Sequence, residues 1–181
     1  INSNLGYNKD YLLTVQAPRD WSENGLRKME IVQHELLQEP VVKSVSLSYE
    51  TPGLLGFNMQ PAFGNNNDTE VQVQRINSDS YFLETYEIPL LAGTFLPKNA
   101  VTNTTNRSVV INKKAMEDFG IRDAESAIGQ QIALNDPNIK MTIVGVTDNF
   151  VANSLHQASP AIVWTDVHES FQYRYFSIGL K

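Results

Sequence analysis

MTIVGVTDNFVANSLHQASP, residues 141–160, is the stretch around which the rest of the chain is organised. Its apolar run at residues 143–146 predicts a buried strand, and the polar pair Asp148-Asn149 follows at once. After a further polar segment, a second apolar run covers residues 161–164. The stretch therefore predicts a strand, a tight crossing and a second strand, and we expect the crossing to join two parts of the molecule.

Four residues are expected to shape this crossing: Asp148, Asn149, Phe150 and His156. Short polar side chains accept hydrogen bonds from backbone amides in tight turns, which is the role expected for Asp148 or Asn149. A second interpretation pairs Asp148 with His156 as a catalytic or metal site, because polar residues after a buried strand are a frequent place for chemistry. The residues alone leave both interpretations open.

Composition limits the class of protein. The chain has 181 residues, 41% of them hydrophobic and 19% charged, which suits one large globular domain or two small lobes. A net charge of -6 argues against nucleic-acid partners and anionic membrane surfaces. The absence of cysteine excludes thiol catalysis, disulfides and cysteine zinc sites. Because the sequence starts with Ile1, we expect it to lie within a longer polypeptide.

The beginning of the chain predicts a strand, a helix and a second strand. Residues 11–15 are apolar, and residues 41–47 are rich in β-branched side chains. Between them, Asp20 and Glu23 have the spacing of a capping box, with Asp20 as the N-cap. The apolar residues expected to face a core from this helix are Leu26, Met29, Val32 and Leu36.

The remaining elements mix strands with short helices. A helix is expected at residues 79–86, capped by Ser78 or Asp79, and a second helix is expected to begin at the cap Asn112. The ranges expected to form strands are 70–76, 108–111, 131–134, 140–146, 161–165 and 172–180. The sequence therefore predicts the α+β class.

The loop at residues 49–67 contains an unusual apolar segment. One interpretation is that this segment folds back onto the core. The other is that it forms an exposed contact surface for a partner protein. The partner-contact residues under the second interpretation are Leu54, Leu55, Phe57 and Met59.

No motif in the sequence predicts an enzyme, a cofactor or a metal site. The phosphate-binding loop and the nucleophile elbow are both missing. His34-Glu35 begins like a zinc-protease motif, but Gln38 stands where the second histidine belongs. His168 lies beside Glu169 in a stretch expected to be a loop, so we expect it to be solvated. We therefore expect neither catalytic nor metal-binding residues.

Six segments follow one another in an order that carries a family resemblance. The segments are NLGYNKDYLLTV, PVVKSVSLS, YFLETYEIPLLAGTFL, SVVINKKAMEDFGI, AIGQQI and IVGVTDNFVANSLHQASPAIV. This order resembles the periplasmic core domain of MacB/FtsX-type ABC transporter permeases, over about residues 4–178. Two departures are Asp148-Asn149-Phe150, one residue longer than the usual Asp-Phe pair, and Gly93-Thr94, where many relatives have Gly-Arg.

The resemblance implies a two-lobed domain on the outer side of the cell inner membrane, in the periplasm. One membrane-proximal, porter-like lobe would contain residues 1–49 and 160–181, and an inserted α+β lobe would contain residues 50–159. Such a domain transmits ATP-driven conformational change and contacts exported cargo or partner proteins. The implied partners are a cytoplasmic ATPase subunit, a second permease copy, and a periplasmic adaptor or cargo protein. The resemblance carries over no catalytic residue and no cofactor.

Two other functions compete with this one. A free-standing periplasmic ligand-binding protein would have a deep cleft between its lobes. A hydrolase would use the Asp148 and His156 side chains, which would then have to lie within hydrogen-bonding reach, directly or through one water.

Overall fold

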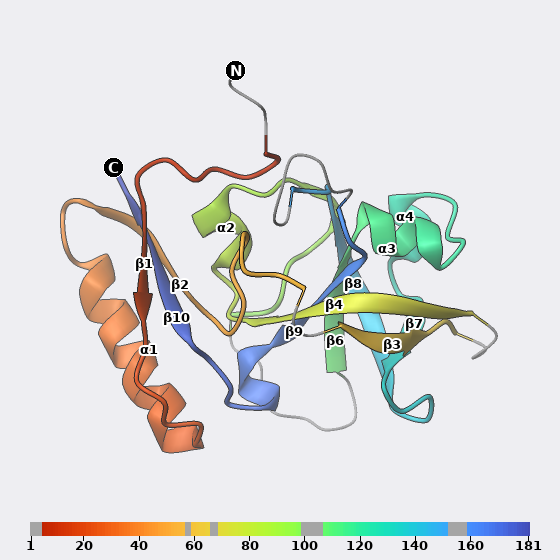
Figure 1. The fold of residues 1–181 in the computed structure, drawn as a ribbon, viewed down its shortest axis with the longest axis horizontal. Helices are drawn as coiled ribbons and strands as arrows, with labels where there is room; N and C mark the ends of the chain where they lie inside the picture. Colours follow the sequence, from red (N-terminus) through yellow and green to blue (C-terminus); the bar gives the residue numbers. More distant parts are fainter. Residues whose placement is uncertain (1–4, 57–58, 66–68, 99–106, 152–158) are drawn as a thin grey trace.

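The computed structural model describes residues 5–56, 59–65, 69–98, 107–151 and 159–181 (Figure 1). The strands are β1 (Leu12–Gln16), β2 (Val42–Ser48), β3 (Met59–Phe63), β4 (Glu70–Ser78), β5 (Leu90–Gly93), β6 (Arg107–Asn112), β7 (Gln131–Leu134), β8 (Lys140–Thr147), β9 (Ile162–Asp166) and β10 (Tyr175–Leu180). The helices are α1 (Glu23–Leu37), α2 (Phe82–Tyr86), α3 (Lys113–Asp118), α4 (Ala124–Ala127) and the 3-10 turn η1 (Val167–Glu169). Strands and helices thus mix along the chain, and the predicted α+β class is confirmed.

Six strands close into a ring, in the order β4, β3, β7, β8, β6 and β9, with β9 pairing back to β4 (Figure 1). The β6–β8 and β4–β9 pairs are parallel, and the other pairs in the ring are antiparallel. Strand β5 pairs with β8 outside this path. Closure leaves the ring strands without a free edge, as in a small β-barrel.

Strands β1, β10 and β2, with α1, form what we call the three-strand unit, beside the ring (Figure 1). Strand β10 lies between β1 and β2 and is antiparallel to both. The unit joins the ring through β2 and β4, which share one pair of residues, Ser48 and Ser78. Leu12 pairs with Gly179, so the chain enters β1 and leaves β10 at the same end of the unit.

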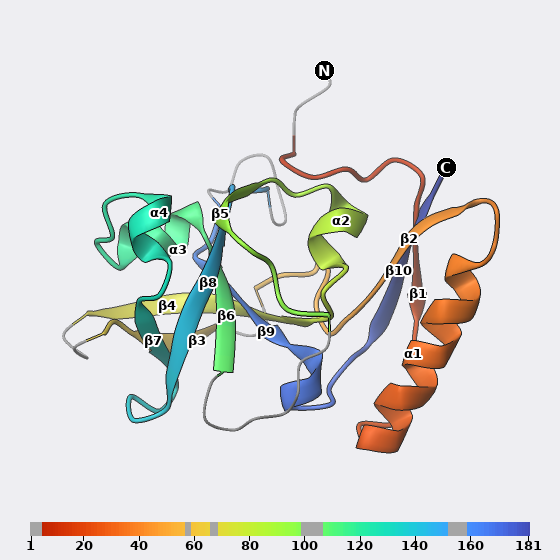
Figure 2. The same cartoon turned by 180° about the vertical axis from the view of Figure 1, so that it is seen from behind.

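Three apolar clusters fill the molecule. The first takes residues from every ring strand, such as Val73 and Ile143, so it occupies the ring interior, and α3 and α4 close over it. Figure 2 shows these two helices on the side of the ring away from α1. The second cluster packs α2 against Trp164 on the outer face of the ring. The third lies between α1 and the strands of the three-strand unit, with Leu26 at its centre.

The buried face of α1 differs from the predicted stripe at one position. Leu26 is buried, and Met29 and Leu36 pack against the third cluster, as expected. Val32 was expected to be buried but is 37% exposed, and Gln33 is buried instead. Gln33 tolerates this position because its Nε2 donates hydrogen bonds to Val45 O and to the Asp79 carboxylate.

The predicted start of α1 is also corrected. Ser22, and not Asp20, is the N-cap, and its Oγ accepts a hydrogen bond from Gly25 N at 3.0 Å. Asp20 instead accepts from Ser22 Oγ. The chain folds back so tightly that a Cβ at Gly25 would lie 2.0 Å from Asp20 O. The predicted cap Asn112 is confirmed, because its Oδ1 accepts from Ala115 N in the first turn of α3.

The strand pairing bears on the expected lobes at one point. Strand β9 was placed with the chain ends, yet it pairs with β4 and β6, which are ring strands. Strands β1, β2 and β10 do pair with one another. The division into residues 1–49 with 160–181 and residues 50–159 stays a prediction.

Candidate functional site

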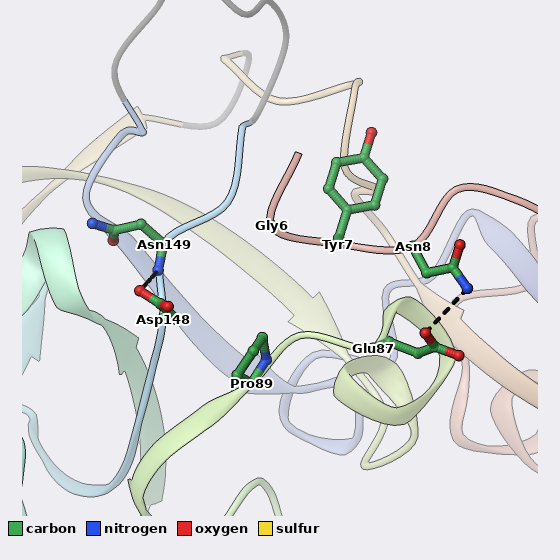
Figure 3. A pocket seen from close by; sticks show the side chains of 7 residues that line it. All are labelled: Gly6, Tyr7, Asn8, Glu87, Pro89, Asp148 and Asn149. Carbon is green, nitrogen blue, oxygen red and sulfur yellow. Dashed lines mark hydrogen bonds between the residues drawn. The ribbon is translucent and has the colours of Figure 1, made fainter. Parts of the chain in front are cut away.

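A pocket of about 340 Å³ lies where the N-terminal segment meets two connections of the ring. One wall is the segment at residues 6–8, the second is the connection between α2 and β5, and the third is the turn after β8 (Figure 3). This size is at the lower end of the range for small-molecule sites. The lining residues are Gly6, Tyr7, Asn8, Glu87, Pro89, Asp148 and Asn149.

Backbone hydrogen bonds hold the three walls together. Asn8 N donates to Tyr86 O at 2.8 Å, and Asp148 N donates to Pro89 O at 2.9 Å. The N-terminal segment passes so close to the turn that a Cβ at Gly6 would lie 2.7 Å from Asn149 O. Gly6 also has φ of 75°, which favours glycine. A larger residue at this position would therefore separate two of the walls.

The turn after β8 uses its polar side chains for the backbone. Asp148 Oδ1 accepts from Asn149 N at 2.8 Å. Asn149 Oδ1 accepts from Lys114 N at 2.9 Å, and Lys114 is in the first turn of α3. The turn is therefore attached to the helix that closes the ring. Phe150 follows it and is 2% exposed, packed edge-on against Tyr7 with ring centres 5.8 Å apart.

The opposite wall carries a charged pair. Glu87 Oε1 accepts from Lys43 Nζ at 2.5 Å. Figure 3 shows the second bond, in which Glu87 Oε2 accepts from Asn8 Nδ2 at 3.1 Å. The bond from Lys43 lowers the pKa of Glu87, so this carboxylate is ionised at neutral pH. Lys43 belongs to β2, and the pair thus links the three-strand unit to the chain after α2.

The polar side chains that line the pocket make contacts that hold the fold together. Asp148, Asn149 and Glu87 bind the backbone or a neighbouring side chain, and among the described lining residues no nucleophile lies beside a base. His156 lies outside the described residues, so its pairing with Asp148 stays a prediction. Within the described part of the chain, no group of three or more His, Asp or Glu side chains is placed to hold a metal ion.

The expected partner-contact residues separate into two kinds. Leu54 is 48% exposed and Met59 is 46% exposed. Leu55 is only 3% exposed and packs in the second apolar cluster with α2, which corrects its expected place on a contact surface. The loop is held inward because Gly56 N donates to Gln74 Oε1 at 2.7 Å. Phe57 lies outside the described residues.

His168 was expected to be solvated, and the structure shows otherwise. Its Nδ1 lies 2.6 Å from Asp166 Oδ1, and its Nε2 lies 2.7 Å from Glu30 Oε1. The hydrogen bond to Asp166, together with the charges of both carboxylates, raises the pKa of His168 to about 9, although burial opposes the rise. His168 therefore joins α1 to the segment after β9. Only the short spacing to Asp166 was visible in the sequence.

A second polar junction surrounds Asp79, at the end of β4. Its carboxylate is buried and accepts hydrogen bonds from Gln33 Nε2, Ser46 Oγ, Leu47 N and Tyr81 N. Burial raises the pKa of Asp79 to about 6, and the four hydrogen bonds oppose the rise. Since Gln33 belongs to α1 and Ser46 to β2, this carboxylate fastens the three-strand unit to the ring.

Two solved structures of transporter regions outside the membrane are similar in fold to this chain. One is the periplasmic region of MacB from Actinobacillus actinomycetemcomitans, with a TM-score of 0.62 at 11% identity, covering 97% of this chain and 77% of that one. Another is the extracellular domain of the transporter YknZ from Gram-positive bacteria, with a TM-score of 0.58 at 14% identity, covering 93% and 84%. At these identities the likeness shows a shared fold. No curated protein matched the sequence.

The family follows from the sequence itself. The family model for the MacB-like periplasmic core domain matches residues 3–180, and the chain belongs to this family. It is thus a periplasmic domain of a MacB-like ABC transporter permease, in agreement with the resemblance carried by the six segments. Among the described helices, none has the length and apolar character required to cross a bilayer.

Proposed function

We propose that the domain transmits ATP-driven conformational change between the membrane part of a transporter and a cargo or partner protein in the periplasm. Membership of the permease family supports the setting, which we place at the cell inner membrane. The observation that carries the transmission is the narrow junction between the three-strand unit and the ring. The two share one strand pair, Ser48 with Ser78, beside the buried Asp79 carboxylate.

The position of the chain ends supports this role. Leu12 and Gly179 are paired neighbours, so both ends of the domain leave from one end of the β1–β10 pair. Movement of the segment after β10 would act first on the three-strand unit, whereas residues 5–8, before β1, also contact α2 and the turn after β8. The unit would then pass the movement through β2, the Asp79 junction and the Lys43–Glu87 pair to the ring.

The proposed partners follow from the family. A cytoplasmic ATPase subunit would act through the transmembrane part of the permease, and a second permease copy would complete the transporter. A periplasmic adaptor or cargo protein would contact the ring. Leu54 and Met59 are exposed apolar residues and are candidates for that contact, together with Phe57.

The experiment measures movement across the junction in the whole transporter, in lipid. This domain has no cysteine, so spin labels are introduced at Arg27→Cys on α1 and Glu125→Cys on α4, which are both exposed. We expect the distance distribution between the labels to change between the ATP-bound state and the ADP-bound state. The matched control pair, Gln72→Cys with Glu125→Cys, joins ring strand β4 to α4, which closes over the ring, and is expected to keep its distribution.

A second experiment links the two sides of the junction with a disulfide. Oxidised Ser48→Cys/Ser78→Cys is expected to remove the change in distance and to slow ATP turnover until a reductant is added, because paired strand positions suit a disulfide. The disulfide Gln131→Cys/Thr142→Cys, within the ring, serves as its control. Identical distance distributions in the two nucleotide states would refute the proposed transmission.

A further inference from the structure

Strand β1 is the outermost strand of the sheet, with β10 on one side only. Hydrogen bonds at both ends of β1 show which residues face β10: Leu180 N donates to Tyr11 O, and Ala17 N donates to Arg174 O. Backbone groups alternate in direction along a strand. The N–H and C=O groups of Leu12, Thr14 and Gln16 therefore point away from β10, toward the free edge.

This edge lacks the features that protect edge strands. Leu12–Gln16 contains no charged residue and no proline, and no strand within the described part of the chain pairs with its outer side. Leu13 is 52% exposed and Val15 is 43% exposed. Both point to the face that carries Phe176 and Ile178, their partners on β10 in the third apolar cluster. The outer edge of β1 thus presents unpaired backbone groups. Beside them, the exposed Leu13 and Val15 extend the apolar face that is buried at Phe176 and Ile178.

We propose that β1 is the contact site for a second copy of this chain, whose own β1 pairs with it in antiparallel orientation about a two-fold axis at Thr14. In this register Thr14 faces Thr14 of the second copy, and Leu12 faces Gln16. All three outward-pointing residues then form hydrogen-bonded pairs. Moving the two-fold axis by two residues would leave fewer of these outward-pointing residues in hydrogen-bonded pairs. An axis at Gln16, for example, would place Thr14 opposite Pro18, which has no N–H to donate.

The side chains fit the same register. Leu13 of each copy faces Val15 of the other in a non-hydrogen-bonded pair, where side chains lie closest. Four exposed apolar side chains thereby become covered, and the two edges close each other in an isologous contact. The strand is also a neutral stretch of a chain with net charge -6, so this surface brings two copies together without opposing like charges.

The extent of the edge indicates how the contact is used. Five residues span about 17 Å of strand edge. A contact of that length buries less area than a typical stable dimer interface. The contact therefore suits two copies that are already held close together, and in this respect it rests on the proposed function, which supplies a second permease copy. Tethering raises the effective concentration into the millimolar range, where a weak strand contact is populated.

The test is disulfide trapping of the 181-residue chain at millimolar concentration. Thr14→Cys places two thiols opposite each other on the axis, within disulfide reach. Gln16→Cys places them about 14 Å apart, four residues out of register. Under mild oxidation we expect about tenfold more covalent dimer from Thr14→Cys than from Gln16→Cys. A mixture of Leu12→Cys and Gln16→Cys chains should again form the mixed dimer.

A proline variant provides an independent measurement. Thr14→Pro removes an N–H that faces the free edge and leaves the bonds to β10 in place, so we expect an unchanged melting temperature and loss of dimer in sedimentation. Equal trapping of Thr14→Cys and Gln16→Cys, or trapping of neither, would overturn the proposal and point to another occupant for the edge. Either result leaves the spin-label experiment across the Ser48–Ser78 junction unaffected, so the two proposals fail separately.

Discussion

Replacing His168 with glutamine is expected to destabilise the domain near neutral pH and to have little effect at high pH. The imidazole lies between Asp166 Oδ1 at 2.6 Å and Glu30 Oε1 at 2.7 Å. Both carboxylates favour its protonated form, and the pKa rises from the ordinary 6.5 to about 9. Glutamine has a similar length but carries no charge, so it keeps part of the hydrogen bonding and loses the attraction.

The magnitude follows from the rise in pKa. A change from 6.5 to about 9 corresponds to about 3 kcal/mol as an upper bound. The Glu30 side chain is 44% exposed, and water screens its attraction, so we expect a loss of about 2 kcal/mol in the free energy of unfolding. For a domain of this size, that corresponds to a fall of about 4–8 °C in the melting temperature.

The pH dependence gives the sharper test. Because the folded-state pKa is raised, this contribution is complete below pH 6.5 and disappears as the pH rises through about 9. Urea unfolding, followed by the fluorescence of the buried Trp164, measures the difference between wild type and His168→Gln at each pH. The control His34→Gln changes an exposed histidine on α1, the helix that carries Glu30, and should be neutral. A His168→Gln difference that is the same below pH 6.5 and above pH 9 would refute the reasoning.

Two further substitutions test the other buried features. Asp79→Asn replaces one of the two accepting oxygens with an NH₂ group, which then faces two hydrogen-bond donors. We therefore expect the free energy of unfolding to fall by about 2–4 kcal/mol at neutral pH. The pKa of Asp79 is raised from 3.8 to about 6, so wild type should gain stability as the pH falls through 6, and a urea series in which Asp79→Asn gains equally would contradict this. Leu55→Ser should cost about 3 kcal/mol because Leu55 is buried, whereas its exposed neighbour Leu54→Ser should stay within about 0.5 kcal/mol. Equal melting temperatures for these two variants would show that the loop is not part of the core.

Local patterns in the sequence were enough for the α+β class, for most elements and for one helix start. Asn112 caps α3 because the accepting oxygen and the amide it binds, on Ala115, are three residues apart. Such a contact depends on neighbouring residues only, and so does the apolar stripe of α1, of which Leu26, Met29 and Leu36 were placed correctly. The six ordered segments also identified the family, and the match over residues 3–180 confirmed it.

Contacts between distant segments were decided by the tertiary structure. His168 meets Glu30 across 138 residues, and Gln33 meets Asp79 across 46, so no local spacing shows that these groups will be buried together. The sequence left open whether Leu55 is buried or exposed, and the packing of the second apolar cluster decides that it is buried. Strand β9 joined the ring because β4 and β6 both had edges to pair, which depends on how the whole sheet closes. Short-range hydrogen bonds and periodicity depend on residues that are close in the sequence. Burial and charge pairing depend on strands and helices that are distant in the sequence and meet only in the folded structure.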